Sequence, residues 1–232
     1  MSKRHNTILK LAFLILVINI RVDGSQSQQS MYYAARKYPT EKMTYKDITT
    51  GQKITMLTTA EAKDDKIYQT NPNWTADGRH IVFRSDRSGT NQYFAISVKT
   101  GTIVQLTDVK QPGNACLCKR KNRMYYVSDN KIWNLDIDSI LQSNGQRQED
   151  EFRSKVADLP ENAGLSGTIS LDSNEQEIYM GVQYTTASWG LLSLDVDTGK
   201  YSKIIDTEFR IGHCQAHPST SGLIMYCWET GG

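Results

Sequence analysis

Seven polar and aromatic side chains along this sequence have the chemistry to bind a carboxylated sugar. They are two arginines, a histidine, a glutamate, a glutamine and two aromatic residues: Tyr68, Gln69, Arg84, Arg87, His213, Trp228 and Glu229. An arginine guanidinium binds a carboxylate through paired N–H donors, and an aromatic face packs against a sugar ring. Together these residue types predict a pocket for an acidic carbohydrate. The alternative is that Arg84 and Arg87 pair with Asp86 and Asp129 on an ordinary surface loop.

A repeat in the sequence indicates how such distant residues could meet. A Thr-Gly pair recurs after acidic or β-branched residues and ends at Gly51, Gly101 and Gly199. The first interval is 50 residues and the second is 98, close to twice the first. A repeat of roughly 40–50 residues built of short strands is typical of β-propeller blades, each of which is a four-stranded sheet. We therefore expect an all-β chain folded as a β-propeller.

A second pattern accompanies the Thr-Gly pairs: an apolar run, a polar turn and an aromatic strand. Residues 73–83 are the clearest copy, with Asp77-Gly78 as the hairpin turn. In the third repeat a polar stretch from Gln142 to Glu151 interrupts the turn, and we expect it to be a loop inserted at the surface. The predicted blades lie near residues 43–60, 68–108, 114–160 and 164–207, with a partial blade over 209–232.

The fifth predicted blade has two strands, so about four and a half blades are present. A propeller must close its ring, and a half-built sheet leaves an unpaired edge. We therefore expect the N-terminal part of a longer protein; a closed four-bladed ring with a tail is the alternative. In a propeller, the loops that enter the first strand and leave the second strand of each blade converge on one face. This geometry places the seven candidate residues at one mouth of the central channel.

The first 27 residues differ from the rest of the chain. Lys3, Arg4 and Lys10 precede an apolar run over residues 11–20, and small or polar residues follow. This pattern predicts a secretory signal peptide, because a membrane-spanning helix needs about 20 apolar residues. We therefore expect residues 1–27 to direct export, to the periplasm or outside the cell. An uncleaved membrane anchor is the alternative.

The charge of the chain argues against a nucleic-acid partner. The formal net charge is +2, but residues 1–27 hold four basic residues and one acidic residue, so the remainder carries −1. Binding to a phosphate backbone needs a basic stripe, and the sequence has none. With 38% hydrophobic and 22% charged residues, the composition is that of a globular protein, neither disordered nor collagen-like.

If the chain is exported, its four cysteines could form disulfides. Cys116 and Cys118 alternate along one predicted strand, so they share a face and cannot readily bridge each other. Cys214 and Cys227 lie on the two strands of one predicted hairpin and could face each other in a disulfide. The alternative is that all four are small buried hydrophobic residues. The spacing of the cysteines and histidines does not fit a zinc site.

Part of the sequence resembles the repeat of TolB-like, WD-type propellers. The segment over residues 71–87 reads Asn-Pro-Asn-Trp-Thr-Ala-Asp-Gly-Arg-His-Ile-Val-Phe-Arg-Ser-Asp-Arg. This resemblance is specific for the fold but not for a function.

Two later segments resemble the oligogalacturonate lyases. They are Ile-Gly-His-Cys-Gln-Ala-His-Pro over residues 211–218 and Met-Tyr-Cys-Trp-Glu-Thr-Gly-Gly over residues 225–232. The Tyr68-Gln69 pair and the Thr-Gly turn at Gly199 also fit that family, so the resemblance covers roughly residues 40–232. Trp228 stands where some members of the family have a histidine, so no functional histidine is carried over to that position.

The resemblance implies a carbon–oxygen lyase that breaks down pectin oligomers by β-elimination. A base removes the proton on C5 of a galacturonate, and the glycosidic oxygen on C4 leaves. A manganese-type divalent metal, held by several histidines and a glutamine, stabilises the charge that develops. In the family these ligands and the catalytic residues lie in later blades, so we expect them beyond residue 232. The implied partner is an acidic oligosaccharide, oligogalacturonate.

We expect no complete metal site within these 232 residues and no activity from them alone. His213 and His217 are the two histidines predicted near the mouth. Four residues apart on one strand they would point to the same face but lie about 13 Å apart at ~3.3 Å per residue, too far to share one ion.

Two other functions remain open on the sequence. The chain could be a non-catalytic TolB-like propeller that binds a protein or a glycan. It could also be the propeller portion of a larger exported enzyme such as a prolyl-oligopeptidase-type peptidase. A Gly-x-Ser-x-Gly nucleophile elbow further along the gene would favour the peptidase, and further blades with clustered histidines would favour the lyase.

Overall fold

The computed structural model describes residues 33–229, and their regular structure is almost entirely β-strand. The predicted signal peptide lies outside these described residues, as do residues 230–232 of the partial blade. Within the described part, no helix is both long and apolar enough to cross a membrane.

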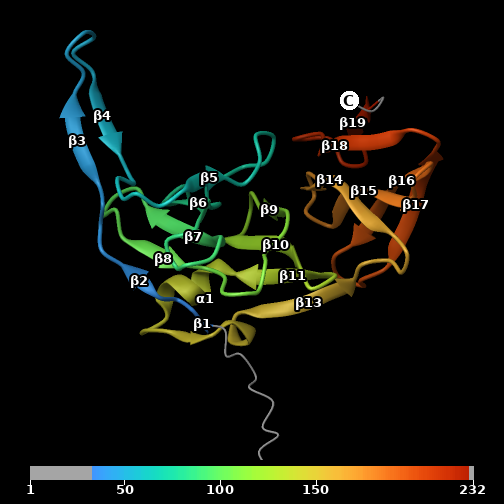
Figure 1. Ribbon diagram of the computed structural model, residues 1–232, viewed down its shortest axis with the longest axis horizontal. Helices are drawn as coiled ribbons and strands as arrows, with labels where there is room; N and C mark the ends of the chain where they lie inside the picture. The colour runs from blue at the N-terminus through green and yellow to red at the C-terminus, as the bar shows by residue number, and fades with distance from the viewer. Residues whose placement is uncertain (1–32, 230–232) are drawn as a thin grey trace, which may run out of the picture. The chain divides into compact units, whose positions relative to one another are not determined.

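Three antiparallel sheets follow one another along the chain (Figure 1). Sheet 2 contains β5 (Asp64–Lys66), β6 (His80–Ser85), β7 (Gln92–Ser97) and β8 (Ile103–Gln105), with β2 (Lys37–Tyr38) added beside β8. Sheet 3 contains β9 (Ala115–Leu117), β10 (Arg123–Ser128), β11 (Lys131–Asp136) and β13 (Arg153–Asp158). Sheet 4 contains β14 (Gly164–Leu171), β15 (Glu177–Thr185), β16 (Ser188–Asp195) and β17 (Tyr201–Thr207). Apart from β2, each strand of a sheet pairs with the strand of that sheet that follows it in the chain.

Two-stranded sheets stand before and after these three along the chain. Sheet 1 is the hairpin of β3 (Met43–Lys46) and β4 (Lys53–Met56), and sheet 5 is the hairpin of β18 (Arg210–Ala216) and β19 (Ile224–Glu229). A short ladder of β1 (Tyr33–Ala34) and β12 (Arg147–Gln148) completes the described strands. The fold is therefore an incomplete β-propeller of four-stranded sheets, as the repeat predicts.

The repeated Thr-Gly pair has a structural cause. At the first copy, Asp47 Oδ1 accepts hydrogen bonds from the backbone N–H and hydroxyl of Thr50, and at the third copy Asp195 Oδ1 binds Thr198 in the same way. Gly51 then adopts a φ of +71°, in the left-handed region that glycine enters at little cost. The repeat thus marks a tight turn between the third and fourth strands of a blade.

The middle strands of each central sheet are buried on both faces, which explains why they are apolar. Along β10, Met124 and Tyr126 pack into the cluster shared with sheet 2, whereas Tyr125 and Val127 pack into the cluster shared with sheet 4. A third cluster joins sheets 4 and 5. Because successive side chains of a strand point to opposite faces, packing between two neighbours demands apolar residues at nearly every position.

The inner strands of the sheets are tied together by polar contacts. Asn71, a buried residue of the loop between β5 and β6, donates from Nδ2 to the carbonyls of Ala115 and Ile169 at 2.9 and 3.1 Å. Ser166 Oγ on β14 donates to the carbonyl of Ile211 on β18 at 2.8 Å. These contacts join the loop of sheet 2 to the inner strands of sheets 3 and 4, and the inner strand of sheet 4 to that of sheet 5.

The sequence predicts a loop at the surface from Gln142 to Glu151, but one residue of this stretch is buried in the structure. The stretch follows α1 (Ile137–Gln142) and contains a 3-10 turn, η1 (Glu149–Glu151), which carries Glu149 into the interior with 1% of its surface exposed. Two residues of α1, Ile137 and Ile140, are buried in the cluster between sheets 2 and 3 and hold the segment against it.

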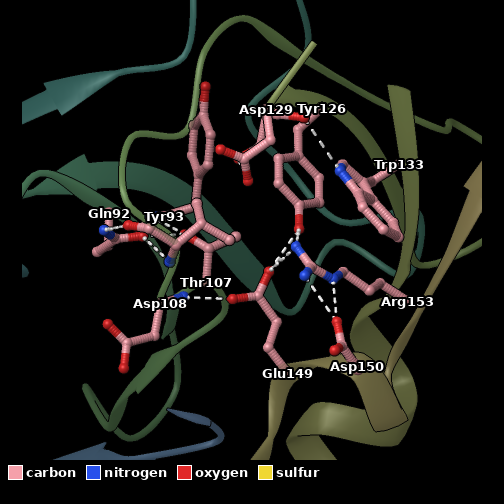
Figure 2. Close-up of polar contacts among 12 residues, drawn as sticks. Gln92, Tyr93, Thr107, Asp108, Tyr126, Asp129, Trp133, Glu149, Asp150 and Arg153 are labelled. Carbon is pink, nitrogen blue, oxygen red and sulfur yellow. Dashed lines mark hydrogen bonds and ion pairs between the residues drawn. The ribbon is translucent and has the colours of Figure 1, made fainter. Parts of the chain in front are cut away.

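Glu149 is surrounded by donors (Figure 2). Its carboxylate accepts hydrogen bonds from the hydroxyl of Tyr126, the backbone N–H of Asp108 at 2.6 Å and Nη1 of Arg153 at 3.2 Å. The Arg153 guanidinium also lies 4.0 Å from the ring centroid of Trp133. Burial raises the pKa of Glu149 above its ordinary value of 4.5, against the opposing effects of Tyr126 and Arg153. We call Glu149, Tyr126 and Arg153 the buried network.

The disulfide considered between Cys214 and Cys227 is not formed. A bulge between Gly212 and Gln215 shifts the register, so that Cys227 lies opposite Gly212 and is exposed while Cys214 is buried. Burial raises the pKa of the Cys214 thiol to about 12. Cys116 and Cys118 are free and buried in one cluster, on the shared face that their alternation predicted.

Candidate functional site

Three of the seven predicted site residues meet in one cluster. The hydroxyl of Tyr68, from the loop between β5 and β6, forms a hydrogen bond with His213 Nδ1 on β18, and the two rings stack with centroids 5.8 Å apart. Nε2 of His213 lies 3.2 Å from Glu229 Oε1, at the end of β19. The other oxygen of Glu229 lies 3.1 Å from Nε of Arg210. We call Tyr68, His213, Glu229 and Arg210 the Tyr68–His213 cluster.

The backbone at this cluster is strained and unusually tight. His213 lies within the bulge of β18 and has a φ of +47°, a left-handed conformation that non-glycine residues seldom adopt. A Cβ on Gly212 would collide with the carboxylate of Glu229, and a Cβ on Gly167 of β14 would lie 3.2 Å from the backbone nitrogen of His213. Two glycines therefore make room for the histidine and its glutamate.

The arrangement joins a hydroxyl, an imidazole and a carboxylate in one series of polar contacts. An ionised Glu229 only accepts hydrogen bonds, so a neutral His213 carries its proton on Nε2 and presents a lone pair on Nδ1. The hydroxyl of Tyr68 then donates to Nδ1. A tyrosine hydroxyl bonded to an imidazole that also contacts a carboxylate is a set of groups that general acid–base catalysis uses. Half of the His213 side chain is exposed, so a ligand can reach the cluster.

Arg87 is not part of this cluster. Its guanidinium is buried and forms ion pairs with Glu41 at 2.6 Å and Asp64 at 2.8 Å. It therefore pairs neither with Asp86 nor with Asp129, the partners considered from the sequence. Its donors anchor the segment before sheet 1 to sheet 2.

The other three predicted residues lie outside the cluster. Nη2 of Arg84 donates to the carbonyl of Pro112 at 3.1 Å, and its Nε is buried with no acceptor among residues 33–229. Gln69 is exposed in the turn next to Tyr68. Trp228 is largely exposed beside Glu229 on β19, with its ring stacked 4.5 Å from that of Phe209.

Sequence reasoning missed Arg210 and the buried network. Arg210 lies directly opposite Glu229 in the register of β18 and β19, but the bulge between Gly212 and Gln215 shifts that register by one residue, so counting back from the hairpin turn would have missed the pair. Glu149 has no signal in the sequence either, because it stands in a run of polar residues.

The described residues do not fit a manganese-type site of the kind that the resemblance implies. Within residues 33–229 no three histidine, cysteine, aspartate or glutamate side chains are grouped to hold an ion. Both ring nitrogens of His213 are engaged in the cluster. His217 lies beyond the end of β18, and its Nδ1 accepts hydrogen bonds from the backbone N–H groups of Ser219 and Thr220.

The chain is similar to known proteins in both sequence and fold. No protein-family model matches the chain. It is 20% identical over 200 residues to the oligogalacturonate lyase of Dickeya dadantii (strain 3937), a match that covers 80% of this chain and 50% of that protein. The chain therefore spans about half the length of the curated relative that it matches.

Two solved structures have the same fold over most of the described residues. The crystal structure of oligogalacturonate lyase from Vibrio parahaemolyticus superimposes with a TM-score of 0.71 at 19% identity, over 83% of this chain and 54% of that one. An oligogalacturonate lyase in complex with manganese gives the same TM-score and identity, over 84% of this chain and 54% of that one. The resemblance to the oligogalacturonate lyases, first found in the residues around His213, is thereby confirmed.

Proposed function

We propose that this chain is the acidic-oligosaccharide-binding half of an exported protein of the oligogalacturonate lyase type. The observation that carries the proposal is the Tyr68–His213 cluster, which unites a loop of sheet 2 with both strands of sheet 5. The resemblance to the lyases includes the segments that supply His213 and Glu229. Export is proposed on the pattern of residues 1–27.

The chemistry of β-elimination explains what this cluster could contribute. The reaction needs a base near the proton on C5 and positive charge near the substrate carboxylate. Tyr68 and His213 can hold and transfer a proton, and Glu229 keeps the histidine oriented. Arg210 is already paired with Glu229. The described half thus offers a proton relay and a binding surface, but it lacks a cluster that could hold a metal against the developing charge.

The first experiment is a titration of the chain with galacturonate oligomers and with neutral galactose oligomers of equal length. We expect binding of the charged oligomers only, because the exposed guanidinium of Arg210 has N–H donors besides the Nε that faces Glu229, and a guanidinium recognises a carboxylate. His213→Ala should weaken that binding at least tenfold, whereas His217→Ala, a matched histidine outside the cluster, should not. Equal binding of charged and neutral oligomers, or equal effects of the two variants, would contradict the proposal.

An elimination assay tests the claim that this is only half of the machinery. With manganese added, we expect no growth of the ultraviolet absorbance of the unsaturated product. Turnover by these 232 residues would show that they suffice for catalysis. It would contradict the proposal that they supply only the binding half of the protein.

A second candidate function is a non-catalytic propeller that binds a protein or a neutral glycan. The largely exposed ring of Trp228 beside the cluster favours it, because an aromatic face packs against a sugar ring without needing a carboxylate. This candidate predicts that galacturonate oligomers do not bind, or that they bind without any need for their carboxylates.

A further inference from the structure

A hollow lined by charged side chains lies at the turn that joins β9 to β10. Its volume is about 500 Å³, and residues 120–123 of that turn line it together with Asp77, Asp136 and Asp138. Four of the five residues 119–123 are basic. Sheets 2 and 3, which supply these residues, each have all four strands of a blade. We call this site the basic hollow; it shares no residue with the Tyr68–His213 cluster.

The cations of the basic hollow are available to a ligand. Among residues 33–229, the side chains of Arg120, Lys121 and Arg123 form no hydrogen bond or ion pair. Arg123 stands opposite Asp136 in the register of β10 and β11. Asp136 instead caps α1, because its Oδ1 accepts a hydrogen bond from the backbone N–H of Ser139 at 3.0 Å.

The carboxylates of the basic hollow are held by uncharged donors and not by these cations. Asp138 Oδ1 accepts from Nδ2 of Asn122 at 2.8 Å, and Asp77 Oδ1 accepts from the hydroxyl of Thr75 at 2.6 Å. An ionised carboxylate has about four acceptor positions on its two oxygens. These carboxylates therefore keep the capacity to accept hydrogen bonds from a ligand.

The turn that carries the cations is fixed through its backbone and through Asn122. The backbone N–H groups of Lys119 and Arg120 both donate to Glu175 Oε1, at 2.6 and 2.8 Å. Asn122 Oδ1 accepts from the backbone N–H of Asp77 at 3.3 Å. Because the turn is already ordered, a ligand does not have to supply the free energy of ordering it.

A second hollow extends the first. It has a volume of about 340 Å³, shares Asp77 and Asp138 with the basic hollow, and adds two further cations, Lys37 and Arg79. The side chain of Arg79 is 80% exposed. The two adjoining hollows therefore offer cations and carboxylates to several successive units of a linear ligand.

The mixture of charges favours a polymer of acidic sugars over a polymer of phosphates. A guanidinium binds a carboxylate through paired N–H donors, and the hydroxyl groups of a sugar can donate to the carboxylates of the protein. A phosphate backbone presents acceptors and negative charge, so Asp77, Asp136 and Asp138 would repel it. A chain of uronic acid units supplies both of the groups that the lining needs.

We propose that the basic hollow and its extension bind a polymer of uronic acid units, at a site separate from the Tyr68–His213 cluster. Exposed charge pairs each contribute little, so a short oligomer is held only weakly there. A polymer places several carboxylates along the two hollows, and the first contact raises the effective concentration for the next. This inference goes beyond the proposed function, because it gives the chain a second binding site.

The test uses His213→Ala as its background, so that the Tyr68–His213 cluster does not hold the polymer. We expect this variant to bind polygalacturonate in calorimetry but not the same polymer with methyl-esterified carboxyl groups. Adding Arg120→Gln and Arg123→Gln should raise the dissociation constant at least tenfold. The matched control adds Arg147→Gln and Lys200→Gln, which remove two exposed charges outside both hollows, and should change it less than twofold.

Three results would overturn the proposal, provided that circular dichroism shows the variants to be folded. They are binding of the esterified polymer, equal losses in the hollow and control variants, and no binding of polygalacturonate by His213→Ala.

A short ligand separates this proposal from the proposed function. Arg120→Gln with Arg123→Gln, in a chain that keeps His213, should bind a galacturonate trimer as tightly as the wild type does. A weaker affinity would contradict the separation of the two sites. A wild type that does not bind the trimer would contradict the proposed function, whereas the polymer titration would still decide the role of the basic hollow.

Discussion

The buried network and the Tyr68–His213 cluster contain the same chemical groups in opposite surroundings. Each combines a tyrosine hydroxyl, a glutamate and an arginine. The side chains of Glu149 and Arg153 are 1% and 9% exposed, whereas those of Glu229 and Arg210 are 25% and 55% exposed. Burial, and not residue type, therefore separates a group that holds sheets together from one that can meet a ligand.

A histidine is the other difference between the two regions. In the buried network the tyrosine bonds directly to the glutamate, with no imidazole between them. In the exposed cluster His213 stands between them and offers a second site for the proton. The strained backbone of His213 supports a functional role, since such conformations gather at binding and catalytic sites.

Loss of an arginine should have the largest effect on stability in the buried network. Arg153→Ala leaves the Glu149 carboxylate with one fewer compensating charge in the interior, which typically costs about 3–5 kcal/mol. Urea unfolding of the variant and the wild type measures this loss of stability. The matched control is Lys155→Ala, which breaks an exposed ion pair with Asp158 and should cost less than about 1 kcal/mol. Similar costs would remove the contrast between the regions.

The free energy of unfolding should depend on pH because the pKa of Glu149 is raised in the folded state. Its folded-state pKa is raised, chiefly by burial, so its contribution is fully present below the ordinary value of 4.5 and is lost as the pH rises through the folded-state pKa. Tyr126, Arg153 and Asp108 face this carboxyl group. In unfolding experiments from acid to neutral pH, the wild type should lose stability relative to Glu149→Gln. A constant difference would contradict this assignment.

A smaller effect on stability is expected at Gly212. The Cβ of Gly212→Ala pushes the Glu229 carboxylate aside, and because that group is the mobile end of a side chain the cost should be about 1 kcal/mol. Binding of galacturonate oligomers should nevertheless fall, since His213 loses its partner. Gly164→Ala, where an added Cβ would meet no atom within 4 Å, is the control and should change neither property.

The smallest expected change in the free energy of unfolding is an increase in stability. A left-handed conformation costs a non-glycine residue roughly 1–2 kcal/mol, and the entropy of an added glycine offsets roughly 0.5–1 kcal/mol of that. His213→Gly should therefore stabilise the fold by about 0.5–1 kcal/mol in urea unfolding. Asn162→Gly, at a left-handed position outside the cluster, is the control for binding. A large loss of stability in His213→Gly would contradict this prediction. It would indicate that the cluster stabilises the fold, as the buried network does.

The sequence predicted the sheets better than it predicted the site, for physical reasons. Strand-forming runs and the Asp-x-x-Thr-Gly turn are local, so their spacing reveals the blades. The bulge at His213 depends on contacts with Gly167 and Glu229 from other strands, and it could not be predicted from its own segment. The same bulge separates Cys214 from Cys227.

Burial of polar residues was equally hidden. Arg87 and Glu149 look like surface residues in the sequence, because the partners that stabilise them come from distant segments. Glu41 and Asp64 pair with Arg87, and Tyr126 donates to Glu149. Tyr68 and His213 were both predicted at the mouth, but their direct contact depends on how the loop of sheet 2 reaches sheet 5.

The affinity of His213→Gly for galacturonate oligomers, measured by calorimetry beside the wild type, tests the central claim most directly. If the Tyr68–His213 cluster is the binding site, the variant loses at least tenfold in affinity although its fold is as stable as the wild type or more so. Unchanged affinity in a folded His213→Gly would contradict the account.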